Sequence, residues 1–451
     1  MFEYVKLKNF KSLGDVIFDM RDRNNNPKKL ILIYGPNGIG KSNLISSFYF
    51  LLETLRTMEI REVLQNFLEN NPEKLNEKDF RMLIESNFLD LEKLVKKYKM
   101  VGSEESLCIE YGFNIEGKRG SYTMNFNNER IIYEKLEYSI VKNRGTIFEI
   151  DNNDKLIFSE KIFTNKDLVE HFNDLIHKYW GKHSFLSILR NDFMDKNKEY
   201  FKGMMIDRIF EVFVFIESIS SHIKQGTRRA EGSFGSARGF LTDYSKFEIQ
   251  KDEEEKLNKA ENMINKFLKS IYPEIKKAYY DREYINDKVK YELILQKEIY
   301  GKVRDIKFSE ESTGIQSIVD MLPFVFSIIE GSIAIIDELD EGIHEILERD
   351  LLMSLLRDMD GQLVMTTQNT LLMEKRELQE FKDNCAIGIP KESFYIMSEL
   401  EGGNKSIECV LKYNNKIHIN TNIRNQYLKG NFTGLPRFID IDFKELNNIL
   451  N

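Results

Sequence analysis

A glycine-rich turn followed by lysine and serine has the composition of a phosphate-binding loop. In "LILIYGPNGIGKSN", residues 30–43, the turn fits the pattern G-x-x-x-x-G-K-[ST]. The glycines can adopt backbone angles that turn successive N–H groups inward, Lys41 can reach the β and γ phosphates, and the Ser42 hydroxyl can ligate Mg²⁺. The pattern predicts ATP or GTP binding with Mg²⁺, by the residues Gly35, Asn37, Gly38, Gly40, Lys41, Ser42 and Asn43.

Two adjacent acids follow an apolar run late in the chain. Residues 333–336, "IAII", are predicted to form a buried strand that ends at Asp337 and Glu338. Parallel strands of such a sheet release their polar residues at one edge, so these acids are expected beside the phosphate loop. Asp337 would hold Mg²⁺ through water, and Glu338 would polarise the attacking water. The alternative is a solvated acidic turn.

A third segment, "FSEESTGIQ" at residues 308–316, places a serine and a glycine before an apolar helix. A hydroxyl and free N–H groups at a helix start can bind an anion. A Ser-x-Gly sequence before a helix is more often an ordinary N-cap. Its position about twenty residues before the acidic strand favours a second phosphate-binding element.

These motifs, with "LKNFKSL" near the N-terminus and "QLVMTTQN" near residue 365, resemble the ABC-type ATPase heads of the RecF, SMC and recombination-repair group. They resemble most the compact AAA-family ATPases of bacterial abortive-infection and anti-phage defence systems. The resemblance covers residues 1–60 and 300–451. It implies an α/β fold: an ABC-type P-loop ATPase head with a mixed β-sheet core, an antiparallel β subdomain and an inserted helical subdomain without a long coiled coil.

The resemblance also implies a site shared between two chains. In such heads, Ser312 and Gly314 of one protomer would contact the γ phosphate bound at Lys41 of the other. Asp340 would lie in the D-loop that crosses the dimer interface. Lys11 occupies the place where related heads contact base, ribose or phosphate. The segment reads S-T-G here rather than S-G-G, which puts only the middle position in doubt.

One position departs from the family pattern. Where related heads place a histidine that senses the γ phosphate, this chain has Gln368. Glutamine can donate a hydrogen bond but cannot carry the positive charge of an imidazolium. We therefore expect a slow ATPase whose ATP-bound dimer persists. The alternative is that Gln368 substitutes adequately and that Thr366 and Thr367 share its work.

The elements around these motifs can be read from hydrophobic periodicity. We expect a hairpin of residues 2–10 and 16–20 that turns near Gly14-Asp15, an antiparallel meander over residues 106–150, helices over 165–224, a flexible Gly/Arg-rich loop over 225–240, a helix over 251–272 and a hairpin over 288–308. We divide the chain into three parts: 1–160 and 301–451, which form the ATPase head, and a mainly helical insertion over 161–300.

Composition limits the choice of function only loosely. The chain has 451 residues and a net charge of −8, which neither demonstrates nor excludes a nucleic-acid partner. Its three cysteines, Cys108, Cys385 and Cys409, have no metal-ligand or disulfide spacing and suit a reducing cytoplasm. No apolar run approaches membrane-spanning length, and we expect a cytoplasmic protein without a membrane partner.

The reading we favour is a nucleotide-gated dimeric sensor in anti-phage defence. It would act as a homodimer or a higher even oligomer that controls a separately encoded effector, such as a nuclease. The alternative is a DNA repair or recombination ATPase that clamps DNA between its heads. A third reading is a nucleotide-binding scaffold whose hydrolysis is vestigial, and the intact Glu338 argues against it.

Overall fold

The structure is a computed structural model of the 451-residue chain. It describes residues 1–70, 90–139, 143–152, 156–160, 165–195, 208–222, 224–225, 228–229, 244–338, 342–375, 388–413, 417–418, 421–436 and 441–449. Most of the Gly/Arg-rich loop expected at residues 225–240, and Asp340 of the expected D-loop, lie outside the described residues.

A mixed sheet carries the phosphate-binding turn. In the described part of the chain it has six strands in the order β19-β18-β3-β17-β16-β9. The strands are β3 (Leu30–Tyr34), β9 (Ile219–His222), β16 (Ile333–Ile336), β17 (Gln362–Thr366), β18 (Phe394–Glu399) and β19 (Lys405–Cys409). Every neighbouring pair is parallel except β18 with β19. The carboxyl ends of β3, β17 and β16 therefore lie at the same edge.

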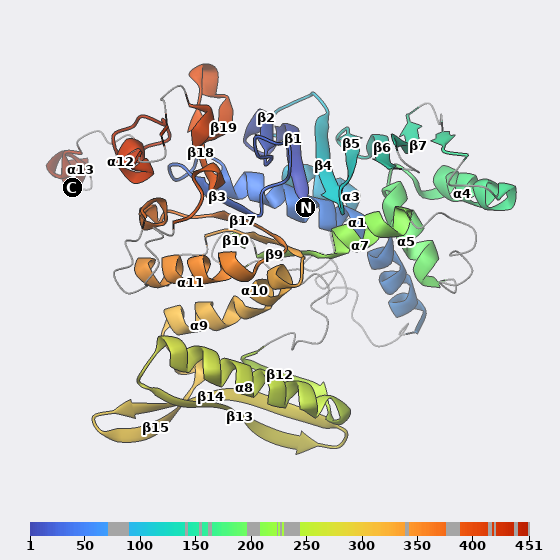
Figure 1. The fold of residues 1–451 in the computed structure, drawn as a ribbon. Coiled ribbons are helices and arrows are strands. Elements are labelled where there is room, and N and C mark those ends of the chain that lie inside the picture. The colour runs from blue at the N-terminus through green and yellow to red at the C-terminus, as the bar shows by residue number, and fades with distance from the viewer. Residues whose placement is uncertain are drawn as a thin grey trace.

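Both faces of this core sheet are covered, and its strands β3 and β16 are accordingly apolar along their length. In β3, Ile31 and Ile33 pack into the cluster that includes α1 (Lys41–Asn70). Leu30, Leu32 and Tyr34 pack on the other face, with α10 (Leu322–Ile329) and α11 (Glu345–Asp358). Figure 1 shows α10 and α11 below the core sheet.

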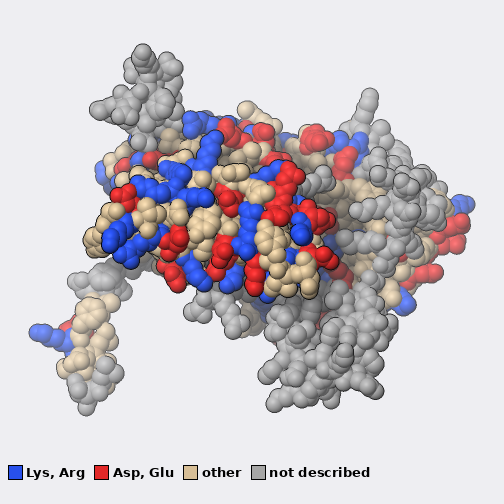
Figure 2. Space-filling view, turned by 90° about the horizontal axis from the view of Figure 1, so that it is seen from below, with Lys and Arg blue, Asp and Glu red and all other residues tan. Residues whose placement is uncertain are grey.

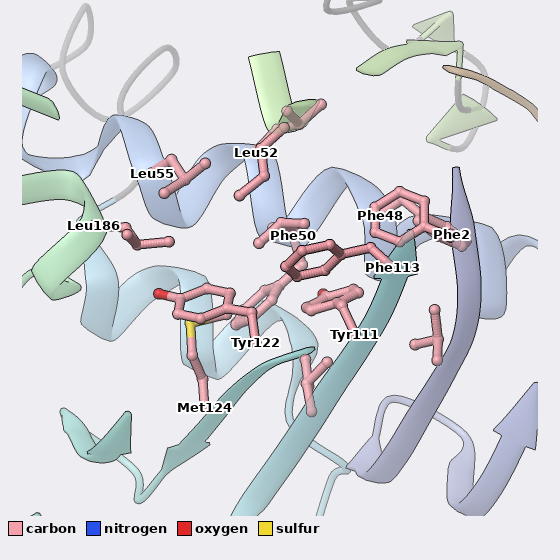
Figure 3. Packing of buried hydrophobic residues seen from close by; sticks show 14 of the residues in the cluster. Phe2, Phe48, Phe50, Leu52, Leu55, Tyr111, Phe113, Tyr122, Met124 and Leu186 are labelled. Carbon is pink, nitrogen blue, oxygen red and sulfur yellow. The ribbon is translucent and has the colours of Figure 1, made fainter. Parts of the chain in front are cut away.

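A second, antiparallel sheet covers α1 on its far side. Within the described residues it has seven strands in the order β2-β1-β4-β5-β6-β7-β8. The strands are β1 (Phe2–Phe10), β2 (Leu13–Asp19), β4 (Leu107–Ile115), β5 (Lys118–Phe126), β6 (Ile131–Ser139), β7 (Arg144–Asp151) and β8 (Leu156–Phe158). Figure 3 shows the aromatic packing between α1 and this sheet, where Phe48 meets Phe2 at a ring-centroid distance of 4.9 Å. This matches the predicted meander.

The first hairpin turns earlier than predicted. We expected the turn near Gly14-Asp15, but β1 and β2 are joined through Lys11 and Ser12, with Phe10 paired to Leu13. Lys11 adopts a left-handed backbone (φ 49°), which tightens the turn without a glycine. The shift matters because it places Lys11 at the tip of the hairpin.

The middle of the chain, residues 161–300, contributes to the cluster around α1, to the core sheet and to a separate lobe. Its helices α4 (Lys166–Tyr179), α5 (Phe185–Asp195) and α7 (Arg208–Glu217) match the helical expectation and pack into the cluster that contains α1. Residues 219–222 were expected to be helical, but they form β9 and pair with β16. The division of the chain at residues 160 and 300 stays a prediction.

The rest of the middle region forms a separate lobe with its own core. The elements of this lobe are β12 (Lys246–Gln250), α8 (Glu254–Ile271), β13 (Ile275–Ile285), β14 (Lys288–Ile299) and β15 (Lys302–Lys307). Helix α9 (Thr313–Asp320) packs into the same cluster. Helix α8 and the β14–β15 hairpin were predicted, and β13 was not. Figure 1 shows this lobe at the bottom, below α9.

In the described part of the chain, no helix combines the length and the apolar character needed to cross a membrane.

A buried glutamine joins the two large sheets. The Gln362 side chain, on β17, accepts a hydrogen bond from the Phe2 N–H (2.7 Å) and donates to the carbonyl oxygens of Phe2 (3.0 Å) and Lys28 (2.9 Å). Gln362 has no exposed surface. These bonds fix the start of β1 against the core sheet, and β1 leads to Lys11.

Replacing Gln362 with leucine should destabilise the fold. The change removes three buried hydrogen bonds, so we expect the free energy of unfolding to fall by about 2–4 kcal/mol. Guanidinium unfolding of both proteins measures this difference. The half-buried Gln296 of the lobe is the matched control, and Gln296→Leu should change stability by less than about 0.5 kcal/mol. Equal effects of the two substitutions would contradict the assigned role of Gln362.

Candidate nucleotide-binding site

The phosphate loop leaves the core sheet at Tyr34 and enters α1 at Lys41. Gly35, Gly38 and Gly40 have positive φ angles of 150°, 78° and 112°. A Cβ at Gly35 would lie 2.6 Å from the carbonyl oxygen of Met397, so that position requires glycine. A Cβ at Gly38 would meet nothing within 4 Å, so the loop is open to solvent at this position. An open loop of glycines at the start of a long helix fits a phosphate group.

The Lys41 side chain lies within this loop. Its Nζ donates to the carbonyl oxygens of Gly35 (2.7 Å) and Pro36 (3.2 Å), and the residue is buried. Ser42 is exposed at the helix start, where its hydroxyl is free to reach a metal ion. Asn43 donates to the Ser12 hydroxyl (2.7 Å), which ties the β1–β2 turn to the loop. The loop therefore places the Lys41 ammonium and the Ser42 hydroxyl next to each other at the start of α1.

The acidic pair follows β16, two strands away from β3. Asp337 is almost fully buried, and its Oδ1 accepts a hydrogen bond from the Thr366 hydroxyl (2.6 Å). The same hydroxyl accepts from the Glu338 N–H (2.8 Å). Glu338 has a left-handed backbone (φ 51°), a conformation that costs about 1–3 kcal/mol and that clusters at functional sites. Thr366 therefore sets the geometry of both acids.

The residues present fit Mg²⁺ and ATP. Ser42 and Asp337 would hold the ion, which when bound draws charge from the phosphate oxygens. The backbone N–H groups of the loop and Lys41 would bind the phosphates. Glu338 would orient a water molecule next to them.

Gln368 lies against the phosphate loop. Its Nε2 donates to the Asn37 side-chain oxygen at 3.1 Å, and Gln368 is exposed whereas its neighbours Thr367 and Asn369 are buried. The predicted switch residue and the predicted loop residue are thus in direct contact.

The turn around Gln368, here called the switch turn, is bound on its core side by a buried carboxylate. Glu348 of α11 accepts hydrogen bonds from the Asn369 amide (2.6 Å) and the Thr367 hydroxyl (3.5 Å). The Asn369 amide also donates to the Glu345 carbonyl (2.9 Å). Gln368 is the one residue of this triplet that faces outward.

Sequence reasoning missed part of this arrangement. It gave Thr366 and Thr367 a share in sensing phosphate, whereas Thr366 bonds to the acidic pair and Thr367 to Glu348. Glu348 and Asn369 were not predicted at all. The available signal was Glu348 on the same helix face as Leu352 in "EILERDLLMSLL", because a buried carboxylate needs a partner.

Lys11 lies at the tip of the first hairpin. Its ammonium is 4.7 Å from the centre of the Tyr98 ring, which belongs to α3 (Leu91–Tyr98). Burial and the nearby positive charge of Lys97 lower the pKa of Lys11 to about 8, while the carboxylates of Glu53 and Asp337 oppose the shift. The attraction to Asp337 places Lys11 within electrostatic reach of the candidate metal site.

Ser312 and Gly314 lie away from this constellation within one chain. They begin α9, and Figure 1 shows α9 on the far side of α10 and α11 from the core sheet. Although Ser312 occupies the N-cap position, its side chain makes no capping hydrogen bond, so the ordinary N-cap alternative is not supported. A Cβ at Gly314 would lie 2.4 Å from the Gly342 carbonyl oxygen, so the segment packs against the chain just after the expected D-loop.

The loop before Ser312 is held rigidly. Lys297 of β14 pairs with Glu311 at 2.7 Å, and both side chains are largely buried. The Gln316 amide donates to the carbonyl oxygens of Phe308 (3.0 Å), Ser309 (3.2 Å) and Glu311 (3.1 Å). Ser312 is therefore exposed at the end of a loop that is held by several contacts.

The parallel core strands, the phosphate loop, the acidic strand end and the outlying α9 lobe define a P-loop ATPase head of the ABC type, as the sequence predicted. Residues 30–374 match the family described as "AAA domain, putative AbiEii toxin, Type IV TA system". The chain belongs to this family.

Solved structures with a similar fold include two SMC heads. The SMC head domain from Thermotoga maritima shares 14% identity at a TM-score of 0.36, covering 91% of this chain and 98% of that one. The Smc head domain with an extended coiled coil, bound to the C-terminal domain of ScpA and derived from Pyrococcus furiosus, shares 14% identity at a TM-score of 0.38, covering 90% and 95%. No curated protein matches the chain.

Nucleotide affinity should depend on the protonation of Lys11. Because its pKa is about 8, the ammonium is mostly charged at pH 7 and mostly neutral at pH 9, so its attraction to phosphate weakens as the pH rises. We expect affinity for a non-hydrolysable ATP analogue, measured by calorimetry, to fall by roughly threefold to tenfold between these pH values.

Lys11→Arg is the matched control because a guanidinium stays charged over this range. Its affinity should change less with pH than that of the wild type. Parallel pH profiles for the two proteins would show that Lys11 does not contact the nucleotide.

Proposed function

We propose that the chain binds ATP and hydrolyses it with Mg²⁺. The observation that carries this proposal is the hydrogen bond of the Thr366 hydroxyl to Asp337, which sets a buried acid beside the strand that feeds the phosphate loop. Lys41, Ser42 and the loop glycines supply the phosphate contacts, and Glu338 acts on the attacking water. Gly35, Asn37, Gly38, Gly40 and Asn43 keep the roles that the sequence predicts.

The site is proposed to be completed by a second chain. Ser312 is exposed, makes no capping bond and lies in a lobe remote from its own phosphate loop. A homodimer would bring Ser312 and Gly314 of one protomer to the γ phosphate at Lys41 of its partner. Asp340, outside the described residues, is proposed to cross that interface.

Hydrolysis is proposed to be slow. The Gln368 amide is neutral and bonds to Asn37, so it can orient a phosphate oxygen but cannot supply positive charge or a proton. A steady turnover below about 10 per second is expected, at or below the middle of ordinary enzyme rates. A long-lived ATP-bound dimer suits a sensor better than a motor.

The biological role is proposed to be anti-phage defence through a separately encoded effector, such as a nuclease, in the cytoplasm. The family description names a toxin of a toxin–antitoxin system and supports this direction. The face viewed in Figure 2 gives the DNA-clamp alternative no support. Figure 2 shows Lys and Arg interspersed with Asp and Glu over the face it views, and ion pairs such as Lys288 with Glu248 and Lys276 with Glu298 offset their charges.

Mixing two inactive variants tests the shared site. Lys41→Ala removes the phosphate contact, and Ser312→Glu places a carboxylate against the γ phosphate, so each variant alone should hydrolyse ATP at less than about a tenth of the wild-type rate. A mixed dimer holds one site with both defects and one intact site. We expect the mixture to recover part of the wild-type rate in a steady-state phosphate-release assay.

The exposed Ser309 on the same loop provides the control, and Ser309→Glu should remain active. If the mixture stays as inactive as its components while both variants fold, the two-chain site is wrong. A wild-type turnover well above about 10 per second would instead contradict slow hydrolysis.

The defence role is tested in cells. We expect the chain, expressed with its neighbouring genes, to reduce phage plaquing by at least about tenfold, with Lys41→Ala abolishing protection because ATP binding gates the effector. Deleting the neighbouring gene should abolish protection as well. Protection by the chain alone would argue against a separate effector.

A further inference from the structure

The short helix α12 (Ile423–Leu428) contacts both strand ends that carry the nucleotide site. It begins after Asn422, whose side chain caps the helix by accepting the Asn425 N–H, and Tyr427 lies buried in the second core cluster. Nothing in the proposed reaction uses this helix. Its contacts nevertheless lead directly to the phosphate loop and the switch turn.

The first contact is to the switch turn. Arg424 donates from Nε to the Thr370 hydroxyl (3.0 Å) and from Nη1 to Glu374 (2.7 Å). These residues lie two and six positions after Gln368. The ion pair is about one-third exposed, so it adds little to global stability. Two donors of one planar guanidinium nevertheless fix the orientation of what they bind.

The second contact is to the phosphate-loop strand. The Tyr427 ring lies 5.9 Å from the ring of Tyr34, the residue directly before Gly35. The Tyr34 hydroxyl donates to the Asn369 carbonyl (3.0 Å), and Asn369 follows Gln368. One helix thus contacts the strand end before Asn37 and the turn that bears Gln368.

Taken with the Glu348 bonds, these contacts hold the switch turn on two sides. Glu348 of α11 binds Thr367 and Asn369 from within the core, and Arg424 binds Thr370 and Glu374 from the outside. Between them Gln368 is exposed, and its amide donates to the Asn37 side-chain oxygen. The position of Gln368 relative to the phosphate loop therefore depends on the bonds that Glu348 and Arg424 make to the residues on either side of it.

We infer that Arg424 is a positioning residue for hydrolysis: it holds the switch turn so that Gln368 faces the phosphate loop. The inference rests on the proposed ATPase function and deepens it. Arg424 acts through Thr370 and Glu374 rather than on the nucleotide. It makes helix α12 part of the machinery that sets the rate.

This role predicts a specific split between binding and turnover. Lys41 and the loop glycines bind most of the triphosphate, so ATP affinity should be nearly unchanged without Arg424. A small displacement of a group that acts in the transition state lowers the rate strongly. For Arg424→Ala we expect kcat to fall roughly tenfold while the Kd for a non-hydrolysable analogue stays within about twofold.

The experiment compares variants of the full-length chain. Arg424→Lys keeps one donor and should retain an intermediate kcat. Arg424→Glu combined with Glu374→Arg reverses the pair and should recover part of the rate lost in Arg424→Glu alone. The exposed Lys429, which follows α12, provides the matched control, and Lys429→Ala should leave kcat unchanged. Thermal unfolding of every variant monitors the fold.

If Arg424→Ala fails to fold, Thr370→Val and Glu374→Gln each remove one of its bonds and should each lower kcat without changing the Kd. If the wild-type chain hydrolyses ATP and these variants keep the wild-type kcat, the inference is wrong but the proposed function stands. Equal losses of affinity and rate also overturn it, because they indicate general disruption. A wild-type chain without hydrolysis overturns the proposed function and the inference together.

Discussion

The site depends on the parallel pairing of three neighbouring strands. In this register Thr366, at the end of β17, lies next to Ile33 of β3 and bonds to the acid that follows β16. Because side chains alternate along a strand, a shift of one residue would turn the Thr366 hydroxyl to the opposite face. The acidic pair would then lose its link to the strand that feeds the phosphate loop.

A second constraint is the cost of burying Glu348. A carboxylate removed from water must be compensated by donors, and the switch turn supplies two of them through Asn369 and Thr367. Removing one hydrogen-bond partner of a buried carboxylate is strongly destabilising. The switch turn is therefore firmly bound to α11, although Gln368 within it is exposed. Helix α11 itself follows Gly342, which packs on Gly314. A chain of contacts therefore runs from the switch turn through α11 to Gly342 and the start of α9.

Sequence patterns predicted the parts of the fold whose signals are local. The loop glycines, the apolar run before Asp337 and the meander are recognisable because spacing alone defines them. Strand β9, "ISSH", was missed because four mostly polar residues after an apolar helix carry little strand signal, and only its pairing with β16 makes it a strand. The hairpin turn was misplaced because Lys11 adopts a glycine-like backbone. The bonds of Glu348 and Arg424 join residues 19 to 54 positions apart, and no periodicity encodes them.

The loop that carries Ser312 is held in place by contacts within its lobe, while Ser312 itself is exposed. The buried pair of Lys297 and Glu311 and the three bonds of the Gln316 amide remove most of the freedom of this loop. An N-cap serine that satisfied its own helix would stabilise α9 by about 1 kcal/mol, and Ser312 forgoes that bond. The hydroxyl and the first N–H groups of α9 therefore remain available to an external anion. In the proposed dimer, that anion would be the γ phosphate held by the other protomer.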